Sequence, residues 1–322
     1  MYYNRTLSPA FAQLLEANGP LHWLFEYVKS HEELDFLIGK NDDGEWISVY
    51  RGLSRILSIR PCSKNLYKLE ADPAYMDMNP NAYDQKLLNI QELNALVQKI
   101  KDNPTKFDRY YENRKEGYYQ NKFSRQFGIS GSPEDPFVIV DKEAVIGYQD
   151  TAEKEKVFGY IQKEYKELQA LVSDTDESRY GKDLETKSLG GELDFLALDK
   201  HGNILLIEYK HGTNTSGIYL SPLQVGFYYD LFTKVLDKVS LSQAVLEMVA
   251  QKQKIGLINP EWKAPKEIKD IIPVLVISEY NYKSTARQKF YEVLEIVRGV
   301  KGSYFLSDIR TYDYVGEELR VW

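Results

Sequence analysis

The sequence has little cysteine and little histidine. One cysteine, Cys62, and four histidines occur among the 322 residues. A single cysteine cannot form an internal disulfide, and this set offers few combinations of thiolate and imidazole ligands. The scarcity excludes an internal disulfide framework and argues against a structural zinc site.

Long apolar runs are also missing. No run approaches the ~18 residues of a membrane-spanning helix, and the longest candidates, such as Ile271–Ile277, have the length of a strand. Residues 1–13 lack the basic and then apolar pattern of a secretory signal peptide. We therefore expect a cytoplasmic protein without a membrane partner.

Glycine-rich motifs of nucleotide and acyl chemistry do not occur either. The sequence contains no Walker-type phosphate loop and no paired-glycine dinucleotide loop, so nucleotide-driven activity within this chain is not expected. The segment Gly128-Ile-Ser-Gly131 does not complete the Gly-x-Ser-x-Gly pattern. No serine-hydrolase elbow is therefore indicated.

Acidic residues outnumber basic residues, and the formal net charge of −7 argues weakly against a general nucleic-acid-binding surface. Residues 99–125 are a local exception, with eight Lys or Arg, four Asp or Glu, and several interleaved aromatic residues. Cations among aromatic rings suit contact with a nucleic-acid backbone and stacking on its bases. The alternative is a solvated helix with a few buried tyrosines. The candidate nucleic-acid-binding residues are Arg109, Arg114, Lys115, Lys122 and Arg125.

The length admits two domains, and 43% hydrophobic with 28% charged residues is ordinary for a globular protein. Residues 1–127 predict an α+β domain that could contact a substrate, and the Gly, Ser and Pro of residues 128–136 predict a linker. Residues 137–322 predict an α/β (α+β) domain with a mixed sheet. The pattern predicts helices over 11–28, 89–100, 151–172, from Ser221, 241–255 and 285–298, and strands that include 137–140, 271–277 and 303–309.

The hairpin Glu192–Gly212 sets three charged residues into an apolar pattern. Gly202 suits the positive-φ position of a three-residue loop, so that Asp199 pairs with Asn203. Counting back along both strands places Asp194 opposite Glu208, on the face that Lys210 also shares. Buried charges are costly unless they are paired, hydrogen-bonded or bound to a metal.

Two opposed carboxylates repel, unless they share a proton or hold a cation. A divalent ion with oxygen ligands would resolve both the repulsion and the burial. The alternative is a structural ion pair between Lys210 and Glu208, with Asp194 near solvent. A glycosidase could use such a carboxylate pair, but the neighbouring lysine fits a metal site better.

A segment with a similar sequence occurs earlier in the chain. Glu33–Arg51 aligns without gaps to Glu192–Lys210, and Glu-Leu-Asp-Phe-Leu recurs in both. Two explanations remain open, a degenerate internal repeat and a chance match of two apolar hairpins. In either case Val49, at the position of Glu208, cannot ligate a metal.

Asp194, thirteen intervening residues and then Glu208-Tyr209-Lys210 resemble the Asp…(Asp/Glu)-x-Lys signature of the PD-(D/E)XK nuclease superfamily. Leu193 stands where the family usually has proline. Upstream, Glu153 lies at the edge of the apolar stripe of the predicted helix 151–172. Its Thr-Ala-Glu-Lys opening is similar to the helix that supplies a further acid in the branch with archaeal junction resolvases. The alternative is a capping box with Asp150.

Downstream, Gln224 and Tyr228 lie four residues apart on one face of the next predicted helix. Gln-x-x-x-Tyr resembles an additional motif of the exonuclease-type branch of the same superfamily. Gln224 could instead complete a capping box with Ser221, and Tyr228 could be a core residue.

The resemblance implies a restriction-endonuclease-like core, with a central mixed sheet flanked by helices. It implies Mg²⁺ (or Mn²⁺) bound by Asp194, Glu208 and the carbonyl of Tyr209, with Glu153 assisting directly or through water. Lys210 would orient the attacking water, and Gln224 and Tyr228 would hold the strand or a metal-bound water. The expected activity is hydrolysis of DNA phosphodiester bonds, by a chain acting alone, as a homodimer or with an accessory subunit. The alternative is a nuclease-like fold that binds nucleic acid or a partner protein without cutting.

Overall fold

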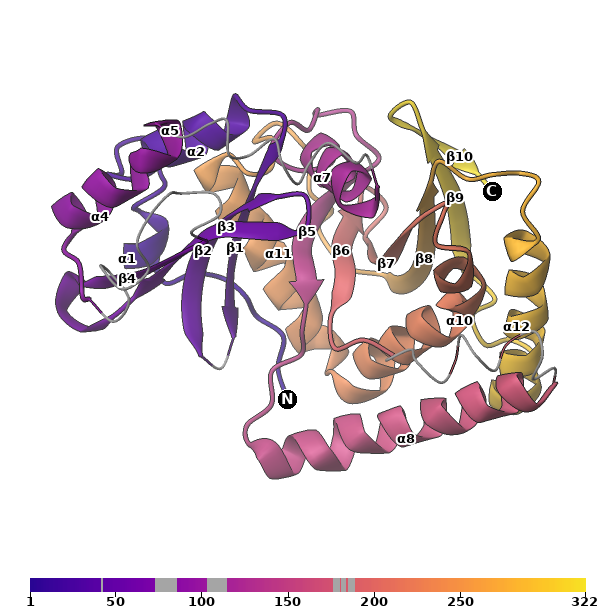
Figure 1. Cartoon of the computed structure of the whole chain (residues 1–322). Helices are drawn as coiled ribbons and strands as arrows, with labels where there is room; N and C mark the ends of the chain where they lie inside the picture. The colour runs from indigo at the N-terminus through magenta and orange to yellow at the C-terminus, as the bar shows by residue number, and fades with distance from the viewer. Residues whose placement is uncertain (42, 73–85, 103–114, 176–179, 181–183, 185–188) are drawn as a thin grey trace. The chain divides into compact units, whose positions relative to one another are not determined.

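The computed structural model describes residues 1–41, 43–72, 86–102, 115–175, 180, 184 and 189–322, and contains two β-sheets (Figure 1). The chain divides into two compact units. The first unit comprises Met1–Tyr3, Lys142–Ser242 and Pro265–Trp322, and the second comprises Asn4–Asp141 and Gln243–Ala264. The division falls within strand β5 (Phe137–Ala144) and helix α11 (Lys238–Ile255).

The second unit contains an antiparallel sheet in the order β1-β2-β3-β4. Its strands are β1 (Leu34–Asn41), β2 (Gly44–Arg51), β3 (Ser54–Pro61) and β4 (Tyr67–Ala71). Side chains alternate between the faces, so Phe36, Ile38 and Val49 enter one core together with apolar residues of helices α2 (His22–Lys29) and α4 (Ile90–Val97). The shorter elements are α1 (Pro9–Ala12), η1 (Ser63–Asn65) and α5 (Lys99–Asp102), followed by α7 (Glu116–Gln126).

The first unit carries most of a six-stranded sheet in the order β10-β9-β8-β7-β6-β5. Strand β7 pairs antiparallel with β6 and parallel with β8, β8 pairs parallel with β9, and β9 pairs antiparallel with β10. The expected mixed sheet flanked by helices is therefore confirmed. The bounds are β6 (Leu193–Asp199), β7 (Asn203–His211), β8 (Asp270–Ser278), β9 (Arg310–Val315) and β10 (Glu318–Val321).

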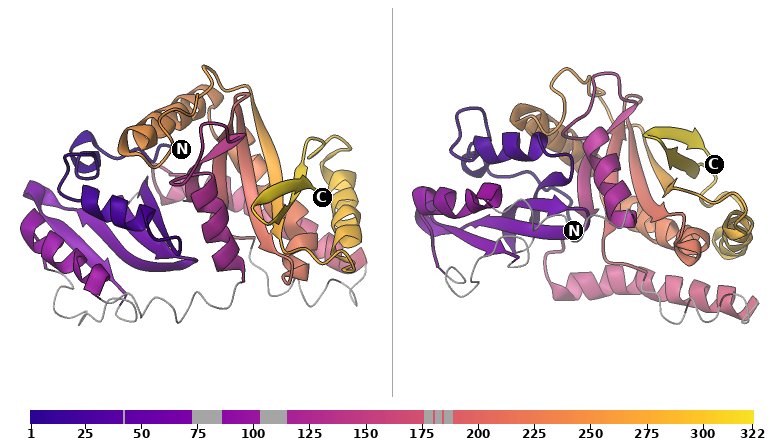
Figure 2. Two further views of the ribbon diagram at one scale, coloured as in Figure 1. Left: turned by 90° about the horizontal axis from the view of Figure 1, so that it is seen from above. Right: turned by 45° about the horizontal axis from the view of Figure 1, so that its top comes forward.

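Helix α10 (Thr215–Asp230) packs against β7 and β8, and α8 (Thr151–Thr175) and α12 (Ala286–Lys301) pack against α10 (Figures 1 and 2). Because α10 lies between the sheet and two helices, it is buried nearly all around, and it continues as a π-helical turn, η5 (Leu231–Val235). The buried carboxylate of Asp230 joins the three helices. Its Oδ2 accepts from the Tyr165 hydroxyl at 2.9 Å and from Lys301 Nζ at 2.7 Å.

Three sequence predictions about the elements were wrong. The predicted helix 11–28 is two helices, interrupted around Gly19 and Pro20, where a proline lacks the backbone donor that a helix needs. Helix α10 begins at Thr215, where Asn214 accepts from the Gly217 amide at 3.0 Å, and not at Ser221. Residues 303–308 form turns because Arg298 binds the carbonyls of Phe305 and Leu306, and the strand starts at Arg310.

The predicted linker at 128–136 is corrected as well. Asn259 Nδ2 donates to the Gly131 carbonyl at 3.1 Å, and Trp262 Nε1 donates to the Asp135 carbonyl at 3.0 Å. These bonds pack the segment within the second unit, and the division of the chain falls between Asp141 and Lys142. The Gly, Ser and Pro residues of this segment therefore form tight turns and not a flexible linker between domains. Within the described residues, no helix combines the length and apolar character that crossing a membrane requires.

Candidate metal-binding site on the β6–β7 hairpin

The turn of the β6–β7 hairpin has the three-residue form that the sequence predicts. Gly202 has φ +92°, and the Asp199 carboxylate accepts from the His201 amide at 2.9 Å and the Asn203 amide at 2.8 Å. The ladder pairs Leu198 with Ile204 and Phe195 with Ile207. One step further along the same register sets Asp194 opposite Glu208. The predicted register is confirmed.

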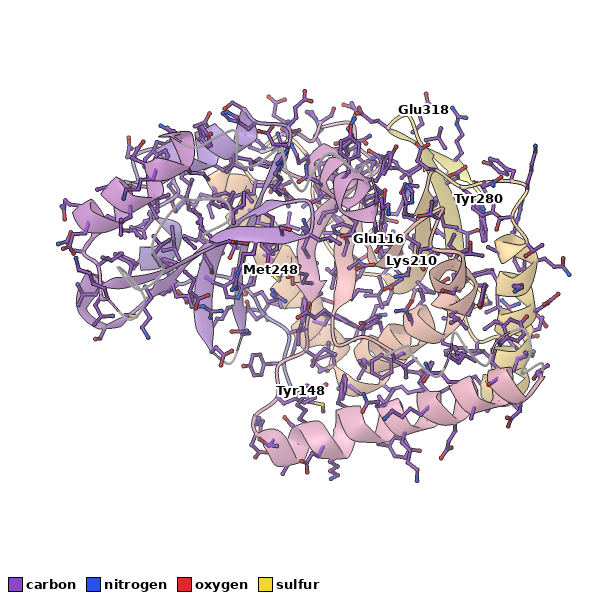
Figure 3. The ribbon with its side chains drawn as sticks, in the orientation of Figure 1. Glu116, Tyr148, Lys210, Met248, Tyr280 and Glu318 are labelled. Carbon is purple, nitrogen blue, oxygen red and sulfur yellow. The ribbon has the colours of Figure 1, made fainter. Side chains whose placement is uncertain are left out.

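Asp194, Glu208 and Lys210 converge on one face of the sheet. Lys210 Nζ, labelled in Figure 3, makes a short ion pair with Glu208 Oε1 and lies 3.8 Å from Asp194 Oδ2. Asp194 Oδ2 also accepts from the Tyr209 amide at 2.7 Å. Glu208 and Lys210 are buried, whereas the exposed fraction of the Asp194 side chain is 25%. Two carboxylates and one ammonium group therefore share a site that is open to solvent beside Asp194.

One oxygen of this site lacks a partner. Glu208 Oε2 is buried and has no hydrogen-bond partner, while Oε1 faces Lys210. A buried carboxylate oxygen without a partner costs free energy, and a cation would remove that cost. All the donor atoms available here are oxygens, the ligands that Mg²⁺ and Mn²⁺ prefer. The residues present therefore fit a hard divalent cation held by Glu208, Asp194 and the main-chain oxygen of Tyr209.

Among the residues that the structure describes, no third acidic ligand lies near this pair. Within the described residues, no three side chains among His, Cys, Asp and Glu lie close enough together to hold a metal ion. Mg²⁺ commonly uses one or two carboxylates and keeps several water ligands. The donor set is thus sufficient for a hydrated Mg²⁺ ion, although it is smaller than the sequence predicts.

Glu153 is the predicted ligand that the structure places elsewhere. Its carboxylate accepts from the Gln149 amide at 2.7 Å and from the Met1 amino group at 3.0 Å, and its own amide donates to Asp150 Oδ1 at 2.8 Å. The backbone hydrogen bond from Gln149, with the nearby ammonium group, holds the Glu153 carboxyl pKa below its usual value. The geometry supports the capping alternative, since the Glu153 carboxylate caps the start of α8, and among the described residues it forms no metal-holding group with Asp194 and Glu208.

Tyr228 lies near the carboxylate pair, where the resemblance to the nuclease superfamily places it. Burial raises the pKa of its hydroxyl, and the negative charges of Glu208 and Asp194 raise it further. The hydroxyl donates to the Glu192 carbonyl, two residues before Asp194. Gln224, one turn earlier on α10, is half-buried. Because α10 begins at Thr215, Gln224 cannot complete a capping box with Ser221.

Gly190 is a site residue that the sequence did not single out. It has φ +81°, and a Cβ atom there would lie 2.6 Å from the Tyr228 hydroxyl. The Gly190-Gly191 pair directly before the β6 strand was the available signal, because paired glycines mark positive φ or close approach. Gly190 and Tyr228 together fix the backbone that leads into Asp194.

Three of the five predicted nucleic-acid-binding residues lie in the part of the chain that the structure describes. Arg109 and Arg114 lie outside the described residues, Lys115 is exposed just before α7, and Lys122 lies 5.3 Å from the Tyr118 ring. Arg125 is buried and donates to the carbonyls of Val28, Leu34 and Lys29 at 2.6 to 3.0 Å. The prediction for Arg125 is wrong, because its guanidinium joins α7 to the backbone of the second unit.

The hairpin of β1 and β2, whose sequence is similar to that of the β6–β7 hairpin, has a different strand register. Asn41 pairs with Gly44 across a two-residue loop, and Asp35 pairs with Tyr50. Asp35 and Val49 therefore lie on opposite faces, whereas Asp194 and Glu208 share one, because a slip of one residue turns every side chain over. The structure gives β1 and β2 a different geometry and no second site of this kind among the described residues.

Comparison of the chain with protein-family models, with curated protein sequences and with solved structures finds no match. The assignment of a function to this chain therefore depends on the geometry of Asp194, Glu208, Lys210 and Tyr228.

Proposed function

We propose that this chain is a metal-dependent nuclease of the PD-(D/E)XK type, with a restriction-endonuclease-like core, that hydrolyses phosphodiester bonds in DNA. The observation that carries the proposal is the convergence of Asp194, Glu208 and Lys210, with one buried oxygen of Glu208 left without a partner. A structural ion pair alone would use the second oxygen of Glu208 or leave it in water. In this protein the Glu208 Oε2 atom neither accepts a hydrogen bond nor contacts solvent, which favours a bound cation.

Asp194, Glu208 and the carbonyl of Tyr209 would hold Mg²⁺ or Mn²⁺. The bound ion would supply a Lewis acid for the phosphate and lower the pKa of a water molecule. Lys210 contributes a positive charge whose position two carboxylates fix, and it can donate to a phosphate oxygen as negative charge develops there. A charge fixed in a buried site requires little reorganisation during the reaction.

Tyr228 and Gln224 have supporting roles in the proposal. Tyr228 holds the backbone at Glu192, so it positions Asp194 rather than touching substrate. The half-buried amide of Gln224, on the same face of α10, can donate to a phosphate or to a water beside the carboxylates. Both side chains come from the helix that covers β7, so their placement depends on the packing of α10.

The proposal is tested by incubating the protein with end-labelled single-stranded, duplex and branched DNA. Mg²⁺, Mn²⁺ and EDTA are compared, and RNA of the same sequence is the counter-substrate. We expect cleavage of DNA with either metal and none with EDTA. Glu208→Gln should abolish cleavage, and Glu167→Gln on the exposed surface of α8 is the matched control with the same change in charge. Cleavage that persists in Glu208→Gln would contradict the proposal.

A second candidate is a nuclease-like fold that binds nucleic acid or a partner protein without cutting. The observation in its favour is that only two carboxylates gather at Lys210, without a third acid among the described residues. Titration calorimetry with Mn²⁺ separates the candidates, because a binding-only fold does not require the ion. Retained DNA binding, with neither metal binding nor cleavage, would favour this second function.

A further inference from the structure

A group of exposed residues lies at the same end of the sheet as Lys210. Strands β7, β8 and β9 are parallel, with Lys210 level with Ile277 and Ile277 level with Asp313. Lys210 and Asp313 are therefore two strands apart on one face, roughly 10 Å between Cα atoms. The loop after β7 also touches the end of β8, since the Gly212 amide donates to the Ser278 carbonyl at 2.6 Å.

Tyr282, in the loop after β8, is held over this end of the sheet. Its hydroxyl donates to Asp313 Oδ2, while its side chain remains 66% exposed. Asp313 is fully buried, and its other oxygen has no hydrogen-bond partner. The ring of Tyr282 thus has a fixed orientation and a surface open to solvent. Tyr280, labelled in Figure 3, supports it with a ring contact at 5.3 Å.

Two guanidinium groups flank the Tyr282 hydroxyl. Arg320 on β10 is directly opposite Asp313 in the ladder. Arg287, in the first turn of α12, lies 5.5 Å from the Trp322 ring, which itself contacts Tyr280. The hydrogen bond to Asp313 raises the pKa of the Tyr282 hydroxyl, whereas the charges of Arg320 and Arg287 lower it, which is consistent with both cations lying close.

These cations are available to an anionic ligand. Among the described residues Arg287 makes no ion pair, and its guanidinium is exposed. Arg320 pairs at 2.8 Å with Glu318, labelled in Figure 3, but both side chains are largely exposed. An exposed ion pair of this kind contributes little to stability, so its exchange for a phosphate costs little. Arginine presents a planar fork of donors that matches a phosphate group.

We propose that Tyr282, Arg287 and Arg320 bind a single strand of DNA next to the scissile bond. The two arginines contact a phosphate, and the Tyr282 ring stacks on a base. This inference rests on the proposed nuclease function, because it places the subsite relative to Lys210. A separation of roughly 10 Å corresponds to about three nucleotides of one strand, at ~3.4 Å of helix axis per nucleotide. The combination of exposed aromatic and cationic groups is typical of surfaces that bind single strands without sequence preference.

The test measures binding and cleavage separately. Fluorescence anisotropy with a labelled single-stranded oligonucleotide gives Kd without divalent ions, and cleavage of the same oligonucleotide is followed with Mg²⁺ or Mn²⁺. The double variant Arg287→Gln/Arg320→Gln should raise Kd at least tenfold, and its slope of log Kd against log salt should be smaller by about 0.7, since the two arginines contact one phosphate and each phosphate contact with a single strand contributes roughly 0.7.

Matched variants distinguish a loss of DNA affinity caused by lost stacking or lost charge from one caused by misfolding. Tyr282→Ala should weaken binding by about fivefold to a hundredfold, because stacking contributes ~1–3 kcal/mol per base. Tyr282→Phe keeps the ring and should retain most of the affinity. Lys163→Gln/Lys166→Gln on the exposed side of α8 removes the same two charges and should leave Kd unchanged. Thermal unfolding of each variant confirms that the folded protein is compared.

The outcomes distinguish the subsite from the nuclease function. If the wild type cleaves DNA and all these variants bind like the wild type, the subsite is overturned and the nuclease function stands. If the wild type binds without cleaving and the Arg287/Arg320 and Tyr282→Ala variants lose affinity, the subsite stands and the nuclease function fails. A wild type that neither binds nor cleaves overturns both.

Discussion

Lys210 Nζ and Glu208 Oε1 form a buried ion pair between two side chains on the same face of β7. The pair leaves Glu208 with one neutralised oxygen and one oxygen that has no partner. Lys210 therefore acts as an internal counter-ion to Glu208, and the proposed divalent cation would not have to displace it.

Replacing Lys210 with methionine should destabilise the metal-free protein. Removal of one partner of a buried ion pair typically costs roughly 3–5 kcal/mol, because the other charge remains buried. Mg²⁺ should restore part of this loss, since the ion neutralises the same carboxylates. Urea unfolding with EDTA and with excess Mg²⁺ measures both effects. Lys166→Met, on the exposed surface of α8, is the matched control. A Lys210→Met protein as stable as the wild type in EDTA would contradict this role.

Asp194→Asn should separate stability from metal binding. The amide oxygen can still accept from the Tyr209 amide, so the metal-free protein should change by no more than about 1 kcal/mol. If Mg²⁺ binds only the folded state, the wild-type protein should gain about 2.7 kcal/mol at a hundredfold excess of Mg²⁺ over Kd. For a chain of this size that is a rise of a few degrees in Tm. In Asp194→Asn this rise should largely vanish, together with cleavage, in calorimetric scans with and without Mg²⁺. An unchanged rise would place the ion elsewhere.

Gly190 and Tyr228 should be energetically coupled. Gly190→Ala places a Cβ atom 2.6 Å from the Tyr228 hydroxyl and requires φ +81°, so it should cost roughly 1–3 kcal/mol. Tyr228→Phe loses one hydrogen bond, worth about 1 kcal/mol. The double variant should be less destabilised than the sum of the two, because the phenylalanine removes the clashing atom. Chemical denaturation of all four proteins gives the coupling, and simple additivity would show that the contact does not matter.

Glu153→Gln should leave cleavage close to that of the wild type and change the pH dependence of stability. The folded carboxyl pKa is lowered, so its contribution is present above the unfolded pKa of ~4.3 and is lost as the pH falls through the folded value. The free energies of unfolding of the wild type and Glu153→Gln should therefore converge in acid. Denaturation across this pH range measures the difference. A large loss of cleavage in Glu153→Gln would instead restore Glu153 to the active site.

The parts of the site that are local in sequence could be predicted. The loop from Asp199 to Asn203 sets the register, and the alternation of a strand then fixes the faces of Asp194, Glu208 and Lys210. The spacing of Gln224 and Tyr228 likewise follows from helical geometry. These inferences needed no knowledge of how distant segments pack.

The parts that failed depend on hydrogen bonds that residue type and periodicity do not reveal. Glu153 sits in a helix start whose distance from the hairpin no local pattern encodes, and its capping bonds with Gln149 and Asp150 compete with any other role. Arg125 is basic and near aromatic residues, yet distant backbone carbonyls bury it. Residues 303–308 alternate like a strand, but Arg298 of α12 binds their carbonyls. Only for Arg125 does the deciding partner lie far away in the sequence, whereas the capping partners of Glu153 and the carbonyls that Arg298 binds lie at most eight residues away.

The difference between a two-residue and a three-residue turn has an evolutionary consequence. Asp194 lies five residues before Asp199, about 17 Å along the strand from the loop. The length of that loop nevertheless determines the face of the sheet on which the Asp194 side chain lies. Loss of one residue from that loop would change no side chain at the proposed metal site, yet it would turn Asp194 away from Glu208. If the proposed site binds a cation, insertions and deletions in this small surface loop should be selected against as strongly as replacements of the acidic residues. Among related chains, the length of the turn should discriminate hairpins that can hold a cation from hairpins that only resemble them.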